Sequence, residues 1–161
     1  RDVDWRARTI HFVPRAQSAA LSNALYAAIF DRGNVCVLLD ESQGPTAPNR
    51  CPRWLRTTIT QGRKRSILHL AATQEPVNVV PVIYSQAEHV FVFRLTGRRD
   101  ELDALAPRLG LDARALQSEL EELPEFAYLR HSIGPGQPVR RMPPLPPDVI
   151  AETERHVRFV V

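Results

Sequence analysis

The sequence predicts an α/β fold whose layered sheet is mostly parallel. Two continuous apolar runs, residues 34–39 and 66–72, are typical of strands that are buried on both faces of such a sheet. Segments with helical spacing alternate with these runs through most of the chain. The chain has 161 residues, of which 43% are hydrophobic and 24% charged, so we expect one folded domain and exclude wholesale disorder.

The first three predicted elements are a strand, a helix and a buried strand. Residues 8–13 (RTIHFV) form a short alternating run, which predicts a strand. Residues 16–31 are rich in Ala and Leu at helical spacing, and Gly33 is a suitable stop signal for that helix. Residues 34–39 (NVCVLL) predict the buried strand, and Asp40-Glu41 follows it directly.

A loop, a helix and a second buried strand come next. Residues 42–50 (SQGPTAPNR) have the composition of a loop, and residues 52–61 suit a helix that begins with a proline. Residues 66–72 (SILHLAA) predict the second buried strand, which ends in Thr73 and Gln74.

The remaining residues predict further helices and strands and then a proline-rich tail. The expected elements are a short helix over 79–87 interrupted by Pro81, a strand over 89–95, helices over 98–109 and 112–123, a strand or hairpin arm over 126–133, a short helix over 149–156 and a final strand over 157–161. We therefore divide the chain into a core, residues 1–133, and a proline-rich linker and tail, residues 134–161.

Polar side chains follow both buried strands. Ligands of parallel sheets bind at the carboxyl ends of the strands, so we expect these polar residues to converge there. Four apolar residues followed by Asp-Glu resemble the acidic motif of P-loop ATPases. In that chemistry Asp40 would hold Mg²⁺ and Glu41 would polarise the attacking water. Buried strands also end in Asp for reasons unrelated to catalysis, so the motif by itself is weak.

Charge is distributed unevenly along the chain. Residues 42–74 contain no acidic side chain but carry six basic ones, Arg50, Arg53, Arg56, Arg63, Lys64 and Arg65. Residues 99–125 have the opposite bias, with eight acidic side chains. Both stretches are consistent with solvated helix faces, and the basic stretch is also consistent with phosphate contacts. The net charge of +3 is compatible with nucleic-acid binding but does not demonstrate it.

The ordered set of motifs resembles the FtsK/HerA-type translocase ATPases. Members of that family have a strand ending in Asp-Glu, a helix, an Arg-containing turn, an apolar strand and then Ala-Thr-Gln-x-Pro. All of these occur here in order, the last as Ala72-Thr-Gln-Glu-Pro76. The resemblance covers residues 8–109 and implies a P-loop NTPase fold that uses ATP and Mg²⁺.

The resemblance also implies roles for individual residues. Gln74 matches the polar sensor of the γ-phosphate or the lytic water, and Thr73 would support it. Arg63 matches the arginine that reaches the nucleotide of a neighbouring subunit, and Arg65 is a competitor for that role. Each of these residues also has a purely structural interpretation. Gln74 would then cap a loop, and Arg63 and Arg65 would lie in a solvated turn.

One part of the family pattern is absent. The phosphate-binding loop GxxxxGK[ST] does not occur in the 161 residues. In the family this loop lies upstream of the acidic strand, so we expect it to precede Arg1 in a longer chain. The alternative is a degenerate relative that does not hydrolyse ATP.

The resemblance implies that the partner is double-stranded DNA, moved through a ring of five or six subunits. The loop 42–50 with Arg50, Arg53 and Arg56 would face the central pore and contact the DNA backbone. No apolar run is long enough for a membrane span, and the two cysteines favour a reducing compartment, so we expect the cytoplasm of a bacterial or phage-infected cell. Packaging, chromosome, conjugation and repair roles remain open. The rival hypothesis is a non-catalytic nucleic-acid-binding or assembly module derived from such an ATPase.

Overall fold

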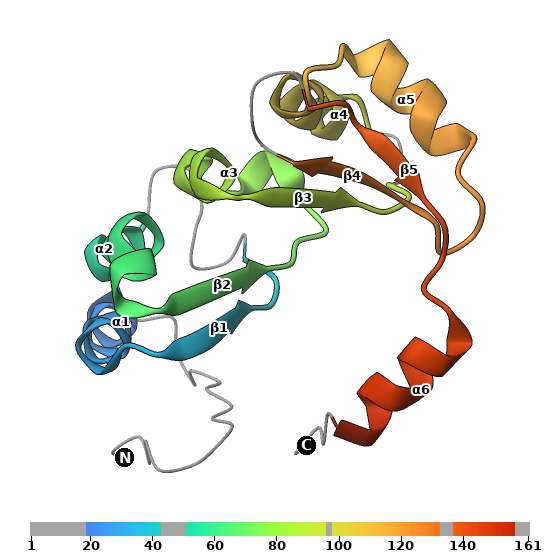
Figure 1. The fold of residues 1–161 in the computed structure, drawn as a ribbon. Coiled ribbons are helices and arrows are strands. Elements are labelled where there is room, and N and C mark those ends of the chain that lie inside the picture. Colours follow the sequence, from blue (N-terminus) through green and yellow to red (C-terminus); the bar gives the residue numbers. More distant parts are fainter. Residues whose placement is uncertain (1–18, 43–50, 96–97, 133–136, 157–161) are drawn as a thin grey trace.

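The computed structural model describes residues 19–42, 51–95, 98–132 and 137–156, without the side chains of the last four (Figure 1). The helices and strands in chain order are α1 (Ala19–Arg32), β1 (Val35–Leu39), α2 (Arg53–Gln61), η1 (Gly62–Arg65), β2 (Ile67–Ala71), η2 (Pro76–Asn78), α3 (Pro81–Gln86), β3 (His89–Val92), α4 (Arg99–Leu105), η3 (Ala106–Leu109), α5 (Ala113–Glu121), β4 (Tyr128–Ser132), β5 (Arg140–Met142) and α6 (Pro147–His156). The strands expected over 8–13 and 157–161 lie outside the described residues.

The strands form a parallel pair and an antiparallel group of three. β1 pairs with β2 in parallel, with Val35 opposite Ile67 and Leu39 opposite Ala71. β3 and β5 flank β4, and both pair with it in the antiparallel sense. The arrows of β1, β2 and β3 point the same way in Figure 1. The expected α/β class is confirmed, and the antiparallel strands are added at one side of the parallel ones.

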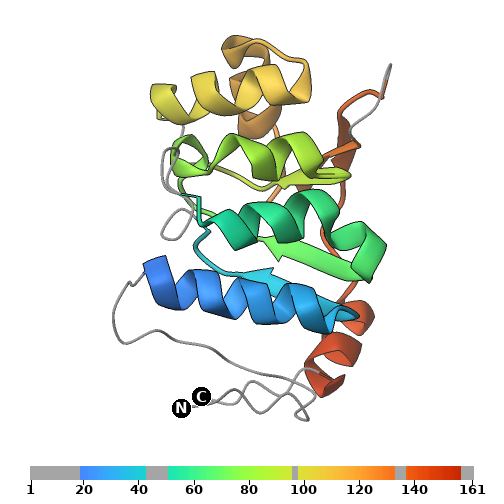
Figure 2. The same cartoon turned by 90° about the vertical axis from the view of Figure 1, so that its left-hand side faces the viewer.

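The helices divide into two groups, each of which buries its own apolar cluster. α1, α2 and α3 lie side by side over one face of the strands (Figure 2). The cluster under α1 and α2 contains Tyr26, Ile29, Leu39, Leu55 and Ile67. A second, larger cluster joins α4 and α5 to β3 and β4 through side chains that include Leu102, Leu116 and Leu129. Burial of these apolar side chains is the main source of stability for both groups, at roughly 25 cal/mol per Å² of apolar surface.

The turn between α1 and β1 is locked against the end of η1. Gly33 has φ +62°, and a Cβ there would lie 2.7 Å from the Arg65 carbonyl oxygen, so only glycine fits. The Asn34 N–H donates to that same carbonyl at 2.8 Å. The Arg65 guanidinium donates to the Phe30 carbonyl oxygen at 3.0 Å and also to that of Asp31, at the carboxyl end of α1. Arg65 therefore satisfies terminal helix carbonyls, where a cation is favoured.

Two expectations about prolines are corrected. Pro81 was expected to interrupt a helix, but it begins α3, because its missing N–H and fixed φ suit the first helical position. The proline-rich linker and tail predicted over 134–161 also contains the short strand β5, which pairs with β4 and which the sequence did not predict. Arg141 of β5 also donates to Glu119 of α5 at 2.6 Å and to Glu122, directly after α5, at 2.7 Å.

The stability of the chain is expected to depend on the protonation of His69. This side chain lies half-buried on β2, and its burial lowers the pKa of the imidazole, against a smaller opposing effect of the Thr58 backbone. Because the unfolded chain then binds the proton more readily, stability should be full above pH 6.5 and fall as the pH drops below it. Urea denaturation at pH 7.5 and 5.5 measures this loss. The His69→Gln variant should show a smaller loss, and an equal loss in both proteins would contradict the prediction.

Candidate functional site

The carboxyl ends of β1 and β2 hold two polar segments next to each other. The Ala72 N–H donates to the Leu39 carbonyl oxygen at 2.9 Å, and the Ser42 N–H donates to the Ala72 carbonyl oxygen at 2.9 Å. The turn that contains Asp40 and Glu41 is thereby fastened to the residue that directly precedes Thr73. The expected convergence of the two segments at one edge is observed.

The acidic turn has a constrained backbone and exposed carboxylates. Asp40 and Glu41 are both exposed, whereas Ser42 is buried at 1% relative exposure. The Glu41 N–H donates to Asp40 Oδ1 at 3.1 Å. Glu41 has φ +47°, in the left-handed region that non-glycine residues seldom adopt. Asn34, Ser66 and Phe126 also have positive φ, so what distinguishes this turn is that its strained backbone carries two exposed carboxylates at the end of a buried strand.

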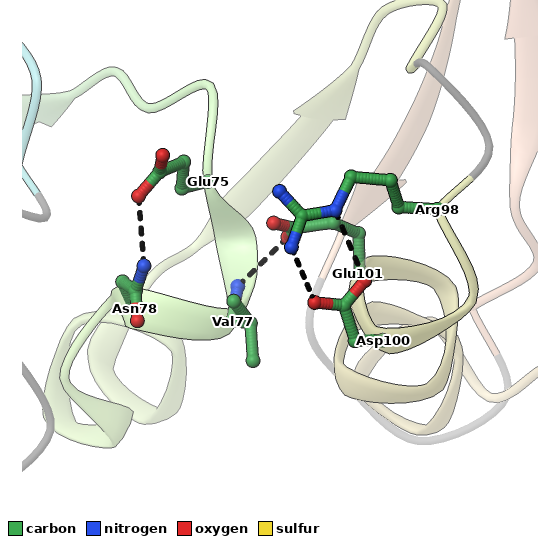
Figure 3. Close-up of polar contacts among 6 residues, drawn as sticks. All are labelled: Glu75, Val77, Asn78, Arg98, Asp100 and Glu101. Atoms are coloured by element: carbon green, nitrogen blue, oxygen red, sulfur yellow. Dashed lines mark hydrogen bonds and ion pairs between the residues drawn. The ribbon is translucent and has the colours of Figure 1, made fainter.

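The segment after β2 is shaped by its own side chains. Thr73 Oγ1 accepts a hydrogen bond from the Glu75 N–H at 3.0 Å, which closes a tight turn around Gln74. The Gln74 side chain is exposed at this turn. Glu75 accepts in addition from the Asn78 side-chain amide at 2.7 Å (Figure 3). Gln74 is therefore exposed to solvent in a turn that is held by the hydrogen bonds of Thr73 and Glu75.

A buried carboxylate on α4 holds the rest of this segment. Glu101 has a relative exposure of 4%, and its Oε2 accepts a hydrogen bond from the Val77 N–H at 2.9 Å (Figure 3). The neighbouring Asp100 instead forms a surface ion pair with Arg98 at 2.7 Å. The interpretation of residues 99–125 as a solvated acidic face is therefore wrong for Glu101. Its partner lies 24 residues away in the sequence, so no local pattern distinguishes Glu101 from its exposed neighbours.

Removal of the Glu101 carboxylate is expected to loosen the segment that carries Gln74. Glu101→Ala leaves the Val77 N–H without its acceptor, which costs about 1–3 kcal/mol when the group stays buried. Glu101→Gln keeps an acceptor oxygen and should lose less. Urea denaturation gives the free energy of unfolding, and hydrogen exchange gives the protection of the Glu75, Val77 and Asn78 amides. The exposed Asp103→Ala is the control on the same helix, and equal effects of Glu101→Ala and Asp103→Ala would contradict the assignment.

The two candidate arginines have different surroundings. Arg65 is bound to the end of α1, as described above. The Arg63 side chain is 82% exposed and forms an ion pair with the exposed Glu88. Arg63 precedes β2 whereas Gln74 follows it, and a strand of five residues spans roughly 16 Å. The structure therefore does not bring Arg63 to the edge that holds the acidic turn of the same chain.

The basic residues proposed for DNA are described only in part. Arg53 and Arg56 are exposed in the first turn of α2, and Arg50 lies outside the described residues. Within the residues that the structure describes, no three His, Cys, Asp or Glu side chains gather as ligands for a metal ion. Among those same residues, no helix combines the length and apolarity needed to cross a membrane.

Solved structures that are similar to this chain include those of viral genome-packaging NTPases. The genome packaging NTPase B204 from Sulfolobus turreted icosahedral virus 2, in complex with ATP-gammaS, matches with a TM-score of 0.68 and 16% identity, over 83% of this chain and 66% of that one. The chain has a P-loop NTPase-like fold. The complex of the same NTPase with AMPPCP matches with a TM-score of 0.67 and 17% identity, over 83% of this chain and 65% of that one.

B204 from Sulfolobus turreted icosahedral virus, described as a DNA-packaging ATPase, gives a TM-score of 0.65 and 16% identity, over 84% of this chain and 66% of that one. The present chain thus spans about two thirds of the length of these NTPases. No protein-family model matches the sequence, and no curated protein matches it. The resemblance to P-loop ATPases stated from the motifs is therefore supported by the fold, at low sequence identity.

Proposed function

We propose that this chain is the C-terminal part of the ATPase domain of a double-stranded DNA packaging motor. The observation that carries the proposal is the edge at which the Asp40-Glu41 turn is fastened beside Thr73-Gln74. The fold shared with a genome packaging NTPase supports packaging over the other DNA-moving roles. A phosphate-binding loop supplied by a longer chain would complete the site.

The residues at this edge suit a magnesium nucleotide. The Asp40 carboxylate is a hard oxygen ligand of the kind that Mg²⁺ prefers, and Mg²⁺ commonly keeps several waters beside one or two protein ligands. Thr73, whose hydroxyl closes the turn around Gln74, would support the Gln74 side chain beside the nucleotide. Bound there, Mg²⁺ would neutralise negative charge on the phosphate oxygens. Glu41 would accept the proton of the attacking water, and the exposed Gln74 amide would orient that water or bond the γ-phosphate.

The remaining roles involve partners of the chain. Arg63 would act on the nucleotide of the neighbouring subunit, because the length of β2 separates it from the Asp40 and Gln74 edge of its own chain. Arg50, Arg53 and Arg56 would contact the DNA phosphates, since exposed guanidinium groups bind the backbone without reading sequence. We assign the assembly to a ring of five or six subunits, working in the cytoplasm of an infected cell.

The Asp40→Asn variant tests the magnesium role. We would make it in the chain extended N-terminally by the sequence that precedes Arg1 in its gene, and measure DNA-stimulated ATP hydrolysis against Mg²⁺ concentration. Half-saturation by Mg²⁺ should shift at least tenfold upward, because one charged ligand is lost. Asp103→Asn is the exposed control on α4. An extended wild-type chain that binds DNA but never hydrolyses ATP would instead support the non-catalytic module.

A further inference from the structure

The sheet of β3, β4 and β5 has two faces of different composition. Side chains of successive strand residues point to opposite faces. Val90, Val92 and Leu129 pack into the apolar cluster with α4 and α5, which cover that face (Figure 1). The register places the alternate residues of the three strands, with Phe93 directly after β3, on the other face. We call it the outer sheet face, and its members are His89, Phe91, Phe93, Tyr128, Arg130, Ser132, Arg140 and Met142.

Three aromatic rings form a row on the outer sheet face. Phe91 and Phe93 are 52% and 57% exposed. The Tyr128 ring neighbours both of them, with centroid distances of 5.9 Å to Phe91 and 5.3 Å to Phe93. Neighbouring apolar groups left in water mark interaction surfaces, and planar rings are the groups on which unpaired nucleobases stack. The row therefore suits a ligand that has several planar groups in succession.

Two arginines of the same face have no carboxylate partner. Arg130 of β4 lies opposite Phe91 of β3 and opposite Arg140 of β5. Within the described residues neither guanidinium forms an ion pair, whereas Arg141, on the other face, binds two carboxylates. The Arg130 Nε atom is buried and lacks a hydrogen-bond acceptor among those residues. The members of the outer sheet face include no acidic residue, so an anionic oxygen would meet uncompensated charge and a donor in need of an acceptor.

A small cavity lies between the two arginines. It has a volume of about 170 Å³ and is lined by Arg130, Ser132, Gln137, Pro138 and Arg140. This volume is roughly an order of magnitude larger than one water molecule needs. The guanidinium, hydroxyl and amide groups of its lining are all hydrogen-bond donors, and a guanidinium binds phosphate oxygens in a bidentate manner. The cavity thus has the space and the donors for a phosphate group beside the aromatic row.

We propose that the outer sheet face binds single-stranded nucleic acid. Consecutive bases would stack on Phe91, Tyr128 and Phe93, and a backbone phosphate would occupy the cavity between Arg130 and Arg140. A row of three rings favours a strand over a single nucleotide. In a duplex the bases are already paired and stacked, so their planar faces do not reach the rings. This surface includes none of the residues proposed for the nucleotide or for duplex DNA, and the inference is independent of ATP hydrolysis.

Binding of a short single strand tests the stacking role. We would use the extended chain, which includes the sequence upstream of Arg1, without nucleotide, and measure fluorescence anisotropy with a labelled oligodeoxythymidine of about 12 nucleotides. Phe93→Leu removes one ring but keeps an apolar side chain, and it should weaken this binding about 5- to 150-fold, the usual contribution of one stacked base. Affinity for a duplex of the same length should fall far less. At Tyr128, substitution by Phe should retain more affinity than substitution by Leu.

The outcomes of this experiment separate the possible ligands. Binding of oligodeoxythymidine, of oligouridine or of both supports the proposal and identifies the sugar that the surface accepts. Equal losses for the strand and the duplex in Phe93→Leu, or no loss for the strand, would overturn it. Failure of the extended wild-type chain to bind any single strand would also overturn it, and ATP turnover retained in that protein would leave the proposed function intact.

Salt dependence gives an independent test of the phosphate cavity. Arg140→Gln removes one guanidinium, so the slope of log K against log salt concentration should become shallower by about 0.7, the value of one phosphate contact in a single strand. Arg114→Gln is the matched control, because this exposed arginine lies on α5, away from the outer sheet face. It should change neither the affinity nor the slope. Equal changes of slope in the two variants would show diffuse attraction to the charge of the whole chain and would contradict a phosphate site.

Discussion

Glu41→Gln in the extended chain is expected to retain ATP binding and to lose turnover by about 10²–10⁴-fold, the usual contribution of a general base. Gln has the size of Glu and keeps an acceptor oxygen, but it cannot take a proton from water. Glu41 is exposed and the substitution keeps the size of the side chain, so the variant should fold normally. Nucleotide binding by a fluorescent ATP analogue and steady-state hydrolysis with DNA separate the two effects.

The control for this experiment is Glu125→Gln, an exposed carboxylate in the turn after α5. It should leave both binding and turnover unchanged. Hydrolysis by Glu41→Gln at the wild-type rate would remove the base assignment while leaving Asp40 as a metal ligand. Loss of binding together with turnover would show instead that the Glu41 side chain holds the nucleotide.

Arg63→Ala is expected to abolish turnover by itself and to recover it when mixed with Glu41→Gln. The Arg63 side chain is exposed and precedes β2, so it is separated by the strand from the edge of its own chain. A guanidinium group supplied by a neighbouring subunit typically raises the kcat of phosphoryl transfer by about 10³–10⁵-fold. In a mixed ring, the Arg63→Ala subunits supply Glu41 and the Glu41→Gln subunits supply Arg63. At equal mixing, about one site in four has a Glu41 subunit next to an Arg63 subunit in the required order and is therefore complete.

Two further variants control the mixing experiment. Lys64→Ala removes the adjacent exposed cation and should retain turnover. Glu88→Ala removes the partner of Arg63 within the chain and should not lower turnover, because Arg63 then needs no release from its ion pair. No recovery in any mixture of Arg63→Ala with Glu41→Gln, although the proteins co-assemble, would exclude the trans-acting role.

Hydrophobic runs were sufficient to predict the elements that form the candidate site. The expected strand over 34–39 appears as Val35–Leu39 and that over 66–72 as Ile67–Ala71. Buried parallel strands need continuous apolar sequence, and this requirement is visible in a window of six residues. The convergence of the two polar strand ends then follows from parallel pairing alone. Short β5 was not predicted, because its sequence RRM carries no apolar pattern and its pairing partner lies in another segment.

The sequence by itself determined the two buried strands β1 and β2, the helices that alternate with them and the polar residues at the ends of these strands, because each depends on neighbours a few residues away. The tertiary structure alone decided which acidic residue of α4 is buried, since the Val77 N–H that holds Glu101 comes from 24 residues earlier. It likewise separated Arg65, bound to α1 across 35 residues, from the exposed Arg63. It also decided which strands pair, because a ladder joins segments that are distant in sequence.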